Sequence, residues 1–219
     1  MSVTPESVRE LLSSEDLGDR LRGVNQIRNL EPAIGFELIQ SAISDKNSRV
    51  RYCAISQLDT LGTEDLDTSL NILRDRLVHD PEPDVQSAAA DCLAALKLTD
   101  AYEDLEYTYY NHPEWLVKFS IVAALGELGD SRAFELLKHA LESENELVKT
   151  AAIGSLGELG DKQAISLLIP YASNPDWQVR YRVVQALYNL GGDEAKDILE
   201  NLTHDKVETV AQTAKSYLN

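Results

Sequence analysis

Apolar residues recur along the chain with a spacing that is typical of short amphipathic helices. In the middle of the chain, the anchor Val117 is followed by Ile121, Leu125 and Leu128, which stand four, eight and eleven positions later. At about 100° per residue these positions gather into one stripe, the buried face of an amphipathic helix. The pattern therefore predicts a series of short helices that each bury a single face.

The anchor valine itself repeats at a nearly fixed period. Its copies are spaced by 31 residues, or by slightly more toward the N-terminus: Val50, Val85, Val117, Val148, Val179 and Val210. An eroded seventh copy precedes them at residues 19–32. Glycine followed by aspartate ends several stripes, as in Gly129–Asp130 and Gly160–Asp161. This pair predicts a left-handed helix end and then the cap of a second helix, so each repeat is expected to be two short helices.

Helix pairs of this size cannot bury their apolar stripes alone, so successive pairs must stack on one another. The predicted fold class is therefore all-α, an α-solenoid of six to seven helix-pair repeats with a period of about 31 residues. We expect one solenoid domain over residues 1–219, with the eroded first repeat at about 1–45 and regular repeats at about 46–219. This organisation leaves no room for a separate catalytic domain.

Positions two, three, six and ten after the anchor point away from the stripe, as do the two residues before it. We expect these positions to line the concave surface, where side chains are free from packing. Several are aromatic, which is unusual for a solvated helix face, although such rings can also cover neighbouring helix ends. The candidate ligand-binding residues on this surface are Tyr52, Trp115, Phe119, Trp177, Tyr181, Arg182 and Gln185.

Two arginines stand directly after an anchor valine, at the edge of the buried stripe. They are Arg51 and Arg180. Because solenoid repeats contact mainly their neighbours, we expect these arginines to pair with carboxylates of adjacent repeats.

The charge narrows the choice of partners. With 37 acidic and 20 basic residues, the formal net charge is −17. Phosphate backbones and anionic lipids repel such a chain, so nucleic acid and membrane surfaces are poor partners. The acidity serves solubility or selects among protein partners. No apolar run is long enough to span a membrane, no signal peptide is recognised, and two cysteines are too few for a disulfide scaffold. We therefore expect an intracellular, cytoplasmic protein.

Familiar catalytic and metal-binding patterns are not found in the sequence. The four histidines are isolated and lack the spacing of metal ligands, so no metal site is predicted. The glycines of GSLGELG, residues 154–160, resemble a nucleotide-binding loop, but no strand precedes them and the repeat period explains them.

The repeat itself has a recognisable relative. Residues 148–187, VKTAAIGSLGELGDKQAISLLIPYASNPDWQVRYRVVQAL, resemble the short HEAT-like repeat of phycobilin lyases in the Val-Lys start and the Leu-Gly-Asp turn. The resemblance covers residues 19–219. The paired segments His-Pro-Glu-Trp (112–115) and Asn-Pro-Asp-Trp (174–177) make the chain most similar to the members of this family that act in cyanobacterial phycobilisome degradation.

The resemblance implies phycobiliproteins such as phycocyanin and allophycocyanin as partners, at phycobilisomes on the thylakoid surface. It implies a phycocyanobilin-type linear tetrapyrrole as ligand or substrate, with no cofactor required. A lyase-like activity that detaches or accepts the thioether-linked bilin is expected. Two alternatives remain open: a non-enzymatic adaptor that delivers phycobiliproteins to a protease, and a lyase that attaches the bilin.

A bilin offers a conjugated face, pyrrole N–H donors and two propionates. Under this resemblance the aromatic candidates would stack on the face, while Arg182 and Lys118 would bind propionates. No catalytic residue is assigned. Asp91, Glu127 and Cys53 are the catalytic candidates. Asp91 or Glu127 would accept hydrogen bonds from pyrrole nitrogens, and Cys53 would transiently accept the bilin as a thiolate.

Overall fold

The computed structural model describes residues 3–218, which are helical almost throughout and contain no strand. One set of helices, here called the anchor helices, carries the anchor valines or stands in the equivalent place. They are α2 (Leu17–Ile27), α4 (Ser48–Ile55) with α5 (Leu58–Leu61), α7 (Pro83–Ala95), α9 (Trp115–Leu128), α11 (Glu146–Leu159), α13 (Trp177–Leu190) and α15 (Glu208–Leu218).

Each anchor helix follows a companion helix in the chain. The companion helices are α1 (Pro5–Leu12), α3 (Pro32–Ile43), α6 (Leu66–His79), α8 (Tyr102–Asn111), α10 (Phe134–Ala140), α12 (Ala164–Leu168) and α14 (Asp193–Leu202). Short 3-10 turns complete the connections: η1 (Gly62–Glu64), η2 (Thr99–Ala101), η3 (Ser131–Ala133) and η4 (Ile169–Ser173). Within residues 3–218 the helices thus form seven consecutive pairs, which confirms the all-α solenoid class.

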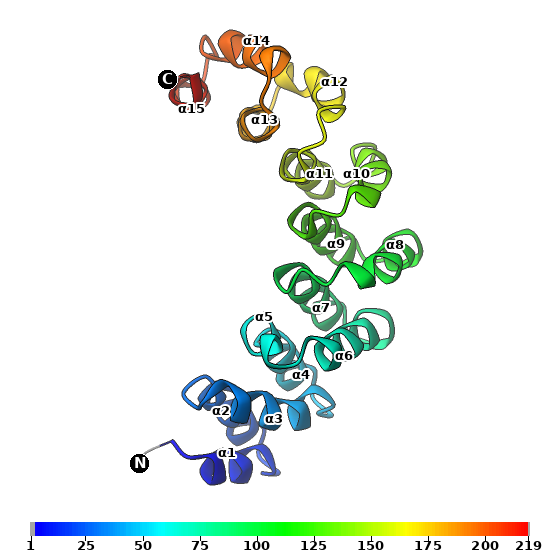
Figure 1. The fold of residues 1–219 in the computed structure, drawn as a ribbon, viewed down its shortest axis with the longest axis vertical. Helices are drawn as coiled ribbons and strands as arrows, with labels where there is room; N and C mark the ends of the chain where they lie inside the picture. Colours follow the sequence, from blue (N-terminus) through cyan, green and yellow to red (C-terminus); the bar gives the residue numbers. More distant parts are fainter. Residues whose placement is uncertain (1–2, 219) are drawn as a thin grey trace. The chain divides into compact units, whose positions relative to one another are not determined.

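The chain divides into two compact units, residues 1–121 and 122–219, and the division falls inside α9. In the first unit, α4 packs against both α2 and α7, while α6 packs against α8 on the companion side (Figure 1). In the second unit, α13 packs against both α11 and α15 (Figure 1). Each anchor helix described here is therefore held by the anchor helices before and after it.

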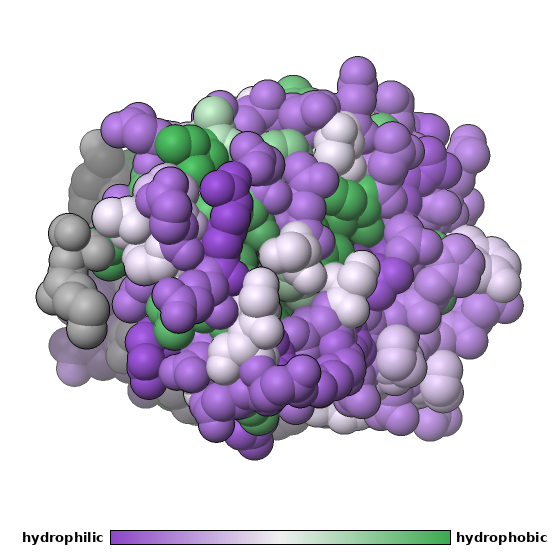
Figure 2. Space-filling model, turned by 90° about the horizontal axis from the view of Figure 1, so that it is seen from below, coloured by the Kyte–Doolittle hydropathy of each residue, from purple (hydrophilic) through white to green (hydrophobic). Residues whose placement is uncertain are grey.

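The predicted stripe is the core of both units. The anchor valines and the residues four positions after them are buried, as in Val179, Val183 and Val117, and the residues eight positions after them are buried in every repeat except the last, where Leu218 is half-buried. At the eleventh position Leu128 and Leu190 are buried, whereas Leu159 is half-buried. The apolar periodicity therefore identified the packing face correctly. The face drawn in Figure 2 is covered mainly by hydrophilic residues, with hydrophobic residues showing in smaller groups between them.

The glycines of GSLGELG have separate structural roles. Gly160 ends α11 in the left-handed region at φ 76°, as predicted, and Gly129 has φ 74° at the end of α9. Gly157 faces α13 so closely that an added Cβ would lie 2.5 Å from the Cα of Ala186. Gly154 instead leaves room for the side chain of Arg182, whose Cδ would lie 3.2 Å away. The corresponding glycine of the next repeat, Gly191, also has positive φ, but its ψ of −173° is not that of a left-handed cap.

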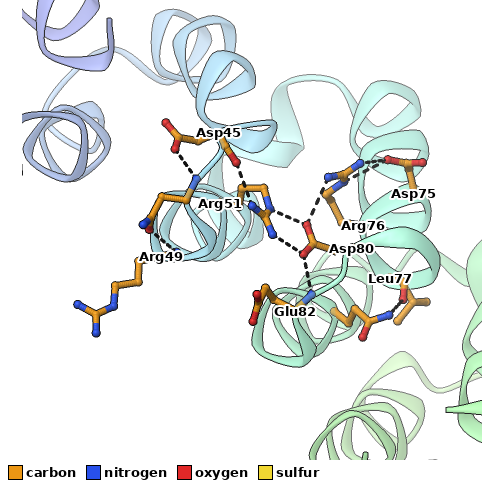
Figure 3. A network of polar contacts seen from close by, with 10 residues as sticks. Asp45, Arg49, Arg51, Asp75, Arg76, Leu77, Asp80 and Glu82 are labelled. Carbon is orange, nitrogen blue, oxygen red and sulfur yellow. Dashed lines mark hydrogen bonds and ion pairs between the residues drawn. The ribbon is translucent and has the colours of Figure 1, made fainter. Parts of the chain in front are cut away.

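A buried arginine joins neighbouring repeats at three places. Arg51, in the first turn of α4, binds Asp80 before α7 through two hydrogen bonds of 2.8 Å, and its third nitrogen donates to the carbonyl of Asp45 (Figure 3). Arg180 binds Asp205 in the same way at 2.6 and 2.8 Å. These contacts confirm the predicted pairing of both arginines.

The eroded first repeat has the same device, which the sequence alone did not indicate. Arg20 of α2 donates to Asp45 at 2.8 Å and to the carbonyl of Ser14 at 3.0 Å. Asp45 in turn accepts from the backbone N–H of Asn47, the cap of α4. Each aspartate therefore binds an arginine of the preceding repeat and shapes the loop that starts its own anchor helix.

These ion pairs shift the pKa of their members in opposite directions. Burial alone would raise the pKa of Asp80, but hydrogen bonds from Arg51 and the N–H of Glu82 outweigh it and lower the pKa below its ordinary value. The hydrogen bonds from Arg180 lower the pKa of Asp205 in the same way. Both carboxyl groups are thus held ionised in the folded protein.

We predict that Gly157→Ala destabilises the protein, because the added methyl group meets the backbone of α13. Overpacking of a close helix contact costs about 1–3 kcal/mol, which exceeds the gain in helix propensity of about 1 kcal/mol. The matched variant Gly154→Ala meets only the flexible Arg182 side chain and should be neutral or slightly stabilising. Urea unfolding followed by circular dichroism compares the two variants, and equal stability would contradict the close approach.

We predict that stability falls as the pH drops below about 4. The pKa of Asp80 and Asp205 is lower in the folded chain than the unfolded value of about 3.9, so their contribution is present above that pH and lost as the pH falls through the folded pKa. Asp80→Asn removes one such group. The slope of unfolding free energy against pH should then decrease by up to about 1.4 kcal/mol per pH unit. Urea titrations between pH 2 and 6 measure this slope, and an unchanged slope would contradict the prediction.

Candidate functional site

The predicted aromatic residues lie on the anchor helices and remain largely in contact with solvent. In the first unit, Tyr52 is 45% exposed, Trp115 is 44% exposed and Phe119 is half-buried. In the second unit, Trp177 is 41% exposed and Tyr181 is half-buried. Neither indole is enclosed by neighbouring helices. The rings are therefore available to a ligand within their own units, and their role stays a prediction.

Several positions on the predicted concave surface are buried, among them Ser87 and Ala88 of α7 and Ser120 of α9. Ser120, three residues after Val117, is only 6% exposed, whereas Arg182 in the equivalent place of α13 is exposed. The reason is that α9 buries more than the predicted stripe, since Val122 and Ala124 are buried as well. The helical wheel was wrong at Ser120 because it allowed only one buried face.

The second unit brings two predicted polar residues together. The guanidinium of Arg182 donates to the side-chain oxygen of Gln185 at 3.3 Å, one turn further along α13. Its aliphatic part lies over Gly154 of α11, where no side chain competes for space. Among the described residues, no carboxylate forms an ion pair with this guanidinium. Arg182 lies on the same helix as Trp177, which begins α13 and is exposed.

Lys118 is engaged elsewhere. Its ammonium lies 5.7 Å from the centroid of the buried Tyr109 ring, a cation–π contact. Burial raises the pKa of Tyr109 to about 12, so its phenol stays neutral, and its ring meets that of Tyr110 edge-on at 5.1 Å. This arrangement turns Lys118 toward the protein and disfavours the propionate contact expected of it.

The first unit contains a cavity of about 550 Å³ beside α4 and α5. Its polar and apolar walls come from the end of α2, the loop that follows, and the second anchor helix. The lining residues are Asn25, Arg28, Leu30, Pro32, Tyr52, Cys53, Ser56, Gln57, Asp59, Thr60 and Leu61. Tyr52 and Cys53 among them are predicted site residues.

A break in the second anchor helix shapes this cavity. The apolar spacing from Val50 to Leu61 predicts one continuous helix, yet α4 ends at Ile55 and α5 begins at Leu58. Gln57 lies in the break, and its side-chain N–H group donates to the carbonyl of Val24 at 2.9 Å and of Cys53 at 3.3 Å. The opposite atom of this amide, Oε1, is buried and has no hydrogen-bond partner. A buried acceptor of this kind favours an N–H or O–H donor from solvent or a ligand.

Sequence reasoning missed Arg28 and Gln57, because neither belongs to a repeated pattern. One signal did mark this copy as different. The spacing from Val50 to Val85 is 35 residues instead of 31.

The two thiols are poor nucleophiles. Burial raises the pKa of Cys53, an effect that the nearby Arg28 charge only partly opposes. Burial also raises the pKa of Cys92 to about 12, and its sulfur lies 3.2 Å from the carbonyl of Ile55. Asp91 and Glu127, the other catalytic candidates, are exposed on α7 and α9. The geometry therefore disfavours the thiolate role considered for Cys53.

The remaining surface adds little chemistry. A second cavity, of about 600 Å³, lies beside the Arg180–Asp205 pair in the second unit and contains none of the predicted site residues. Across residues 3–218, no group of His, Cys, Asp and Glu side chains could hold a metal ion. None of the described helices has the length and apolar character needed to cross a bilayer.

Comparison with known proteins identifies the family. The pattern of HEAT repeats matches residues 5–94, 70–157 and 135–219. The chain belongs to the HEAT-repeat family. No curated protein matches it.

Solved structures of similar fold have low sequence identity to this HEAT-repeat protein. The complex of CpcE and CpcF of phycocyanin lyase from Nostoc sp. PCC7120 matches with 20% identity and a TM-score of 0.64, covering 100% of this chain and 94% of that chain. The X-ray structure of Escherichia coli YibA matches with 18% identity and a TM-score of 0.69, covering 98% and 80%. At such identities the likeness establishes the fold alone.

We predict that alkylation distinguishes the two cysteines in the native protein. At pH 7.5, Cys53 should react with iodoacetamide more slowly than in the urea-unfolded chain, because burial disfavours its thiolate. Its rate should rise with pH. Cys92, which is 2% exposed, should react only after unfolding. Mass spectrometry of the alkylated peptides measures both rates. A Cys53 rate equal to that of the unfolded chain would restore its candidacy as a nucleophile.

Proposed function

We propose that this HEAT-repeat protein binds phycobiliproteins and detaches or accepts their thioether-linked bilin during phycobilisome degradation. The resemblance of its repeats to those of phycobilin lyases supports this class of partner, and the full-length similarity in fold to the CpcE–CpcF complex agrees with it. The finer assignment, to the phycobilisome-degradation protein called non-bleaching protein B, rests on the paired segments that end at Trp115 and Trp177. YibA is equally similar in fold, so the fold does not select the function by itself.

The exposed indoles are the observation on which the proposal depends. Trp115 and Trp177 begin α9 and α13 at equivalent places, and each keeps more than two fifths of its surface in water. Large rings exposed at repeated positions are costly for solubility and are typical of binding surfaces. The intervening repeat has Glu146 at this position, so the helix pair folds without the ring. The indoles are therefore better explained by a ligand or partner than by packing.

The second unit offers chemistry that suits a bilin. The conjugated face can stack on Trp177 or Tyr181, and the Arg182 guanidinium can bind a propionate with two parallel hydrogen bonds. Gln185 orients that guanidinium through the 3.3 Å hydrogen bond. Cleavage of a thioether needs a positioned proton donor or acceptor, for which the exposed carboxylates Asp91 and Glu127 remain candidates.

A second candidate function is a non-enzymatic adaptor that delivers phycobiliproteins to a protease. The thiol chemistry favours it, because burial raises the pKa of both Cys53 and Cys92 and so disfavours covalent acceptance of the bilin. In that case the indoles would contact the phycobiliprotein itself, where tryptophans commonly dominate binding energy.

We predict that the double variant Trp115→Ala and Trp177→Ala binds phycocyanin at least about tenfold more weakly, with unchanged helicity. Loss of a tryptophan from the centre of an interface costs about 2 kcal/mol or more. Pull-down of phycocyanin and visible absorbance during incubation are the measurements. The control is Tyr107→Ala, which removes an exposed ring from the companion helix α8.

The same incubation separates the functions. Transfer of bilin absorbance to this protein, or bleaching of phycocyanin, supports detachment, whereas binding without spectral change supports the adaptor. A covalent adduct formed from apo-subunit and free bilin supports an attaching lyase. Full binding and activity in the double variant would remove the indoles from the mechanism.

A further inference from the structure

The cavity beside α4 and α5 has the dimensions of a small-molecule site. Its volume of about 550 Å³ falls within the range of about 300–1,000 Å³ that is usual for ligand pockets. Such pockets combine apolar walls with a few placed polar groups. Here Leu30, Pro32 and Leu61 supply apolar surface, and the polar groups differ in what they can bind.

The first polar group is a guanidinium without a carboxylate partner. Arg28 lies just after the end of α2, and its hydrogen bond is to the side-chain oxygen of Asn25 at 3.4 Å. Within the described part of the chain no carboxylate forms an ion pair with it, although the protein carries a net charge of −17. Its charge acts inside the cavity, since it lowers the pKa of Cys53 against the effect of burial. This position favours an anionic group of a ligand.

The second polar group is an acceptor that lacks a donor. The two hydrogen bonds from the Gln57 amide nitrogen, to Val24 and Cys53, fix which way the amide faces. The buried Oε1 therefore cannot rotate toward another partner without breaking both. Asp59 also lines the cavity and accepts from the Thr60 hydroxyl at 3.0 Å, so a second acceptor stands at the same site. These acceptors favour N–H donors on the ligand.

The third feature is an exposed ring. Tyr52 is 45% exposed and lines both this cavity and a smaller hollow formed with Ser48, Arg49 and Asp84. Its face can cover a planar conjugated group. A ligand of this site would thus combine a carboxylate, N–H donors and a flat unsaturated ring system.

We infer that this cavity binds a linear tetrapyrrole, with a propionate on Arg28, a pyrrole N–H on Gln57 and the conjugated system against Tyr52. The inference rests on the proposed function and deepens it: it assigns the bilin to this cavity of the first unit, in place of the surface of Trp177, Tyr181 and Arg182 considered above. The tryptophans are then left to contact the phycobiliprotein. Cys53 stands in the same cavity as a neutral thiol, where it can report occupancy without reacting with the ligand.

The test uses the full chain and biliverdin, a free linear tetrapyrrole with two propionates. Biliverdin should bind with a change in visible absorbance and slow the alkylation of Cys53. Arg28→Gln should weaken binding at least about tenfold, because hydrogen bonds to a charged group are worth about 1.5–3 kcal/mol. Biliverdin dimethyl ester, which lacks the carboxylates, should bind wild type and Arg28→Gln alike. Tyr52→Leu should weaken both ligands.

Arg22→Gln is the matched control, since Arg22 lies on α2, which Arg28 directly follows, is exposed, pairs with Asp19 and does not line the cavity. It should bind biliverdin as wild type does, and circular dichroism checks that every variant is folded. If wild type binds biliverdin but Arg28→Gln, Tyr52→Leu and the Cys53 rate are unchanged, the site is wrong and the proposed function stands. If wild type captures phycocyanin but does not bind biliverdin, the tetrapyrrole site is overturned and the adaptor is favoured. If it binds neither, both proposals fail.

Discussion

The structure depends on the burial of each short helix against the helices of neighbouring repeats. A pair of helices of at most 14 residues each exposes its apolar stripe unless another pair covers it, so the repeats are stable only together. In the second unit this burial brings α11 and α13 close enough to require glycine at position 157. The same constraint divides the side chains of an anchor helix into those that pack against other helices and those that face solvent. Residues at the anchor and four or eight positions later are committed to packing, and those that point away from the stripe are free to bind.

Electrostatic contacts supplement this burial at some repeats and not at others. The arginine after the anchor position binds an aspartate of the next repeat in the first, second and sixth pairs. In the copies between, the equivalent residues are Gln86, Lys118 and Lys149, which instead contact the Leu77 carbonyl, the Tyr109 ring and Glu146. A buried ion pair fixes geometry more than it adds stability, because desolvation offsets much of the attraction. The arginines therefore act chiefly by setting how one anchor helix starts relative to the next.

The fold was predictable because it rests on periodic residues, and the cavity was not because it rests on an irregularity. The spacing of Val117, Ile121 and Leu125 predicts which face of the helix is buried, and a glycine before aspartate predicts where a helix ends. The break between α4 and α5 has no such mark, since residues 50–61 keep the apolar spacing and contain neither glycine nor proline. Ser120 was misplaced for the opposite reason, because α9 buries residues outside the stripe that the period defines. Exposure of the indoles was predictable from the period, whereas their ligand is not determined by it.

The distribution of charge explains how such a protein could recognise a small carboxylate while remaining unsuited to polyanions. Its net charge of −17 repels nucleic acid and anionic membranes over distances up to the Debye length of about 8 Å. Arg28 and Arg182 have no carboxylate partner among the described residues, and each is oriented by an amide, that of Asn25 or Gln185. A guanidinium oriented in this way binds a carboxylate at hydrogen-bond distance. At that distance, the hydrogen-bond geometry and partial desolvation outweigh the repulsion from the protein's net negative charge. A ligand with one or two carboxylates and a large apolar face meets that requirement, because stacking on nearby rings supplies the binding energy that a highly charged polymer would lose to repulsion. The unpaired arginines and the exposed rings thus support the tetrapyrrole ligand proposed above.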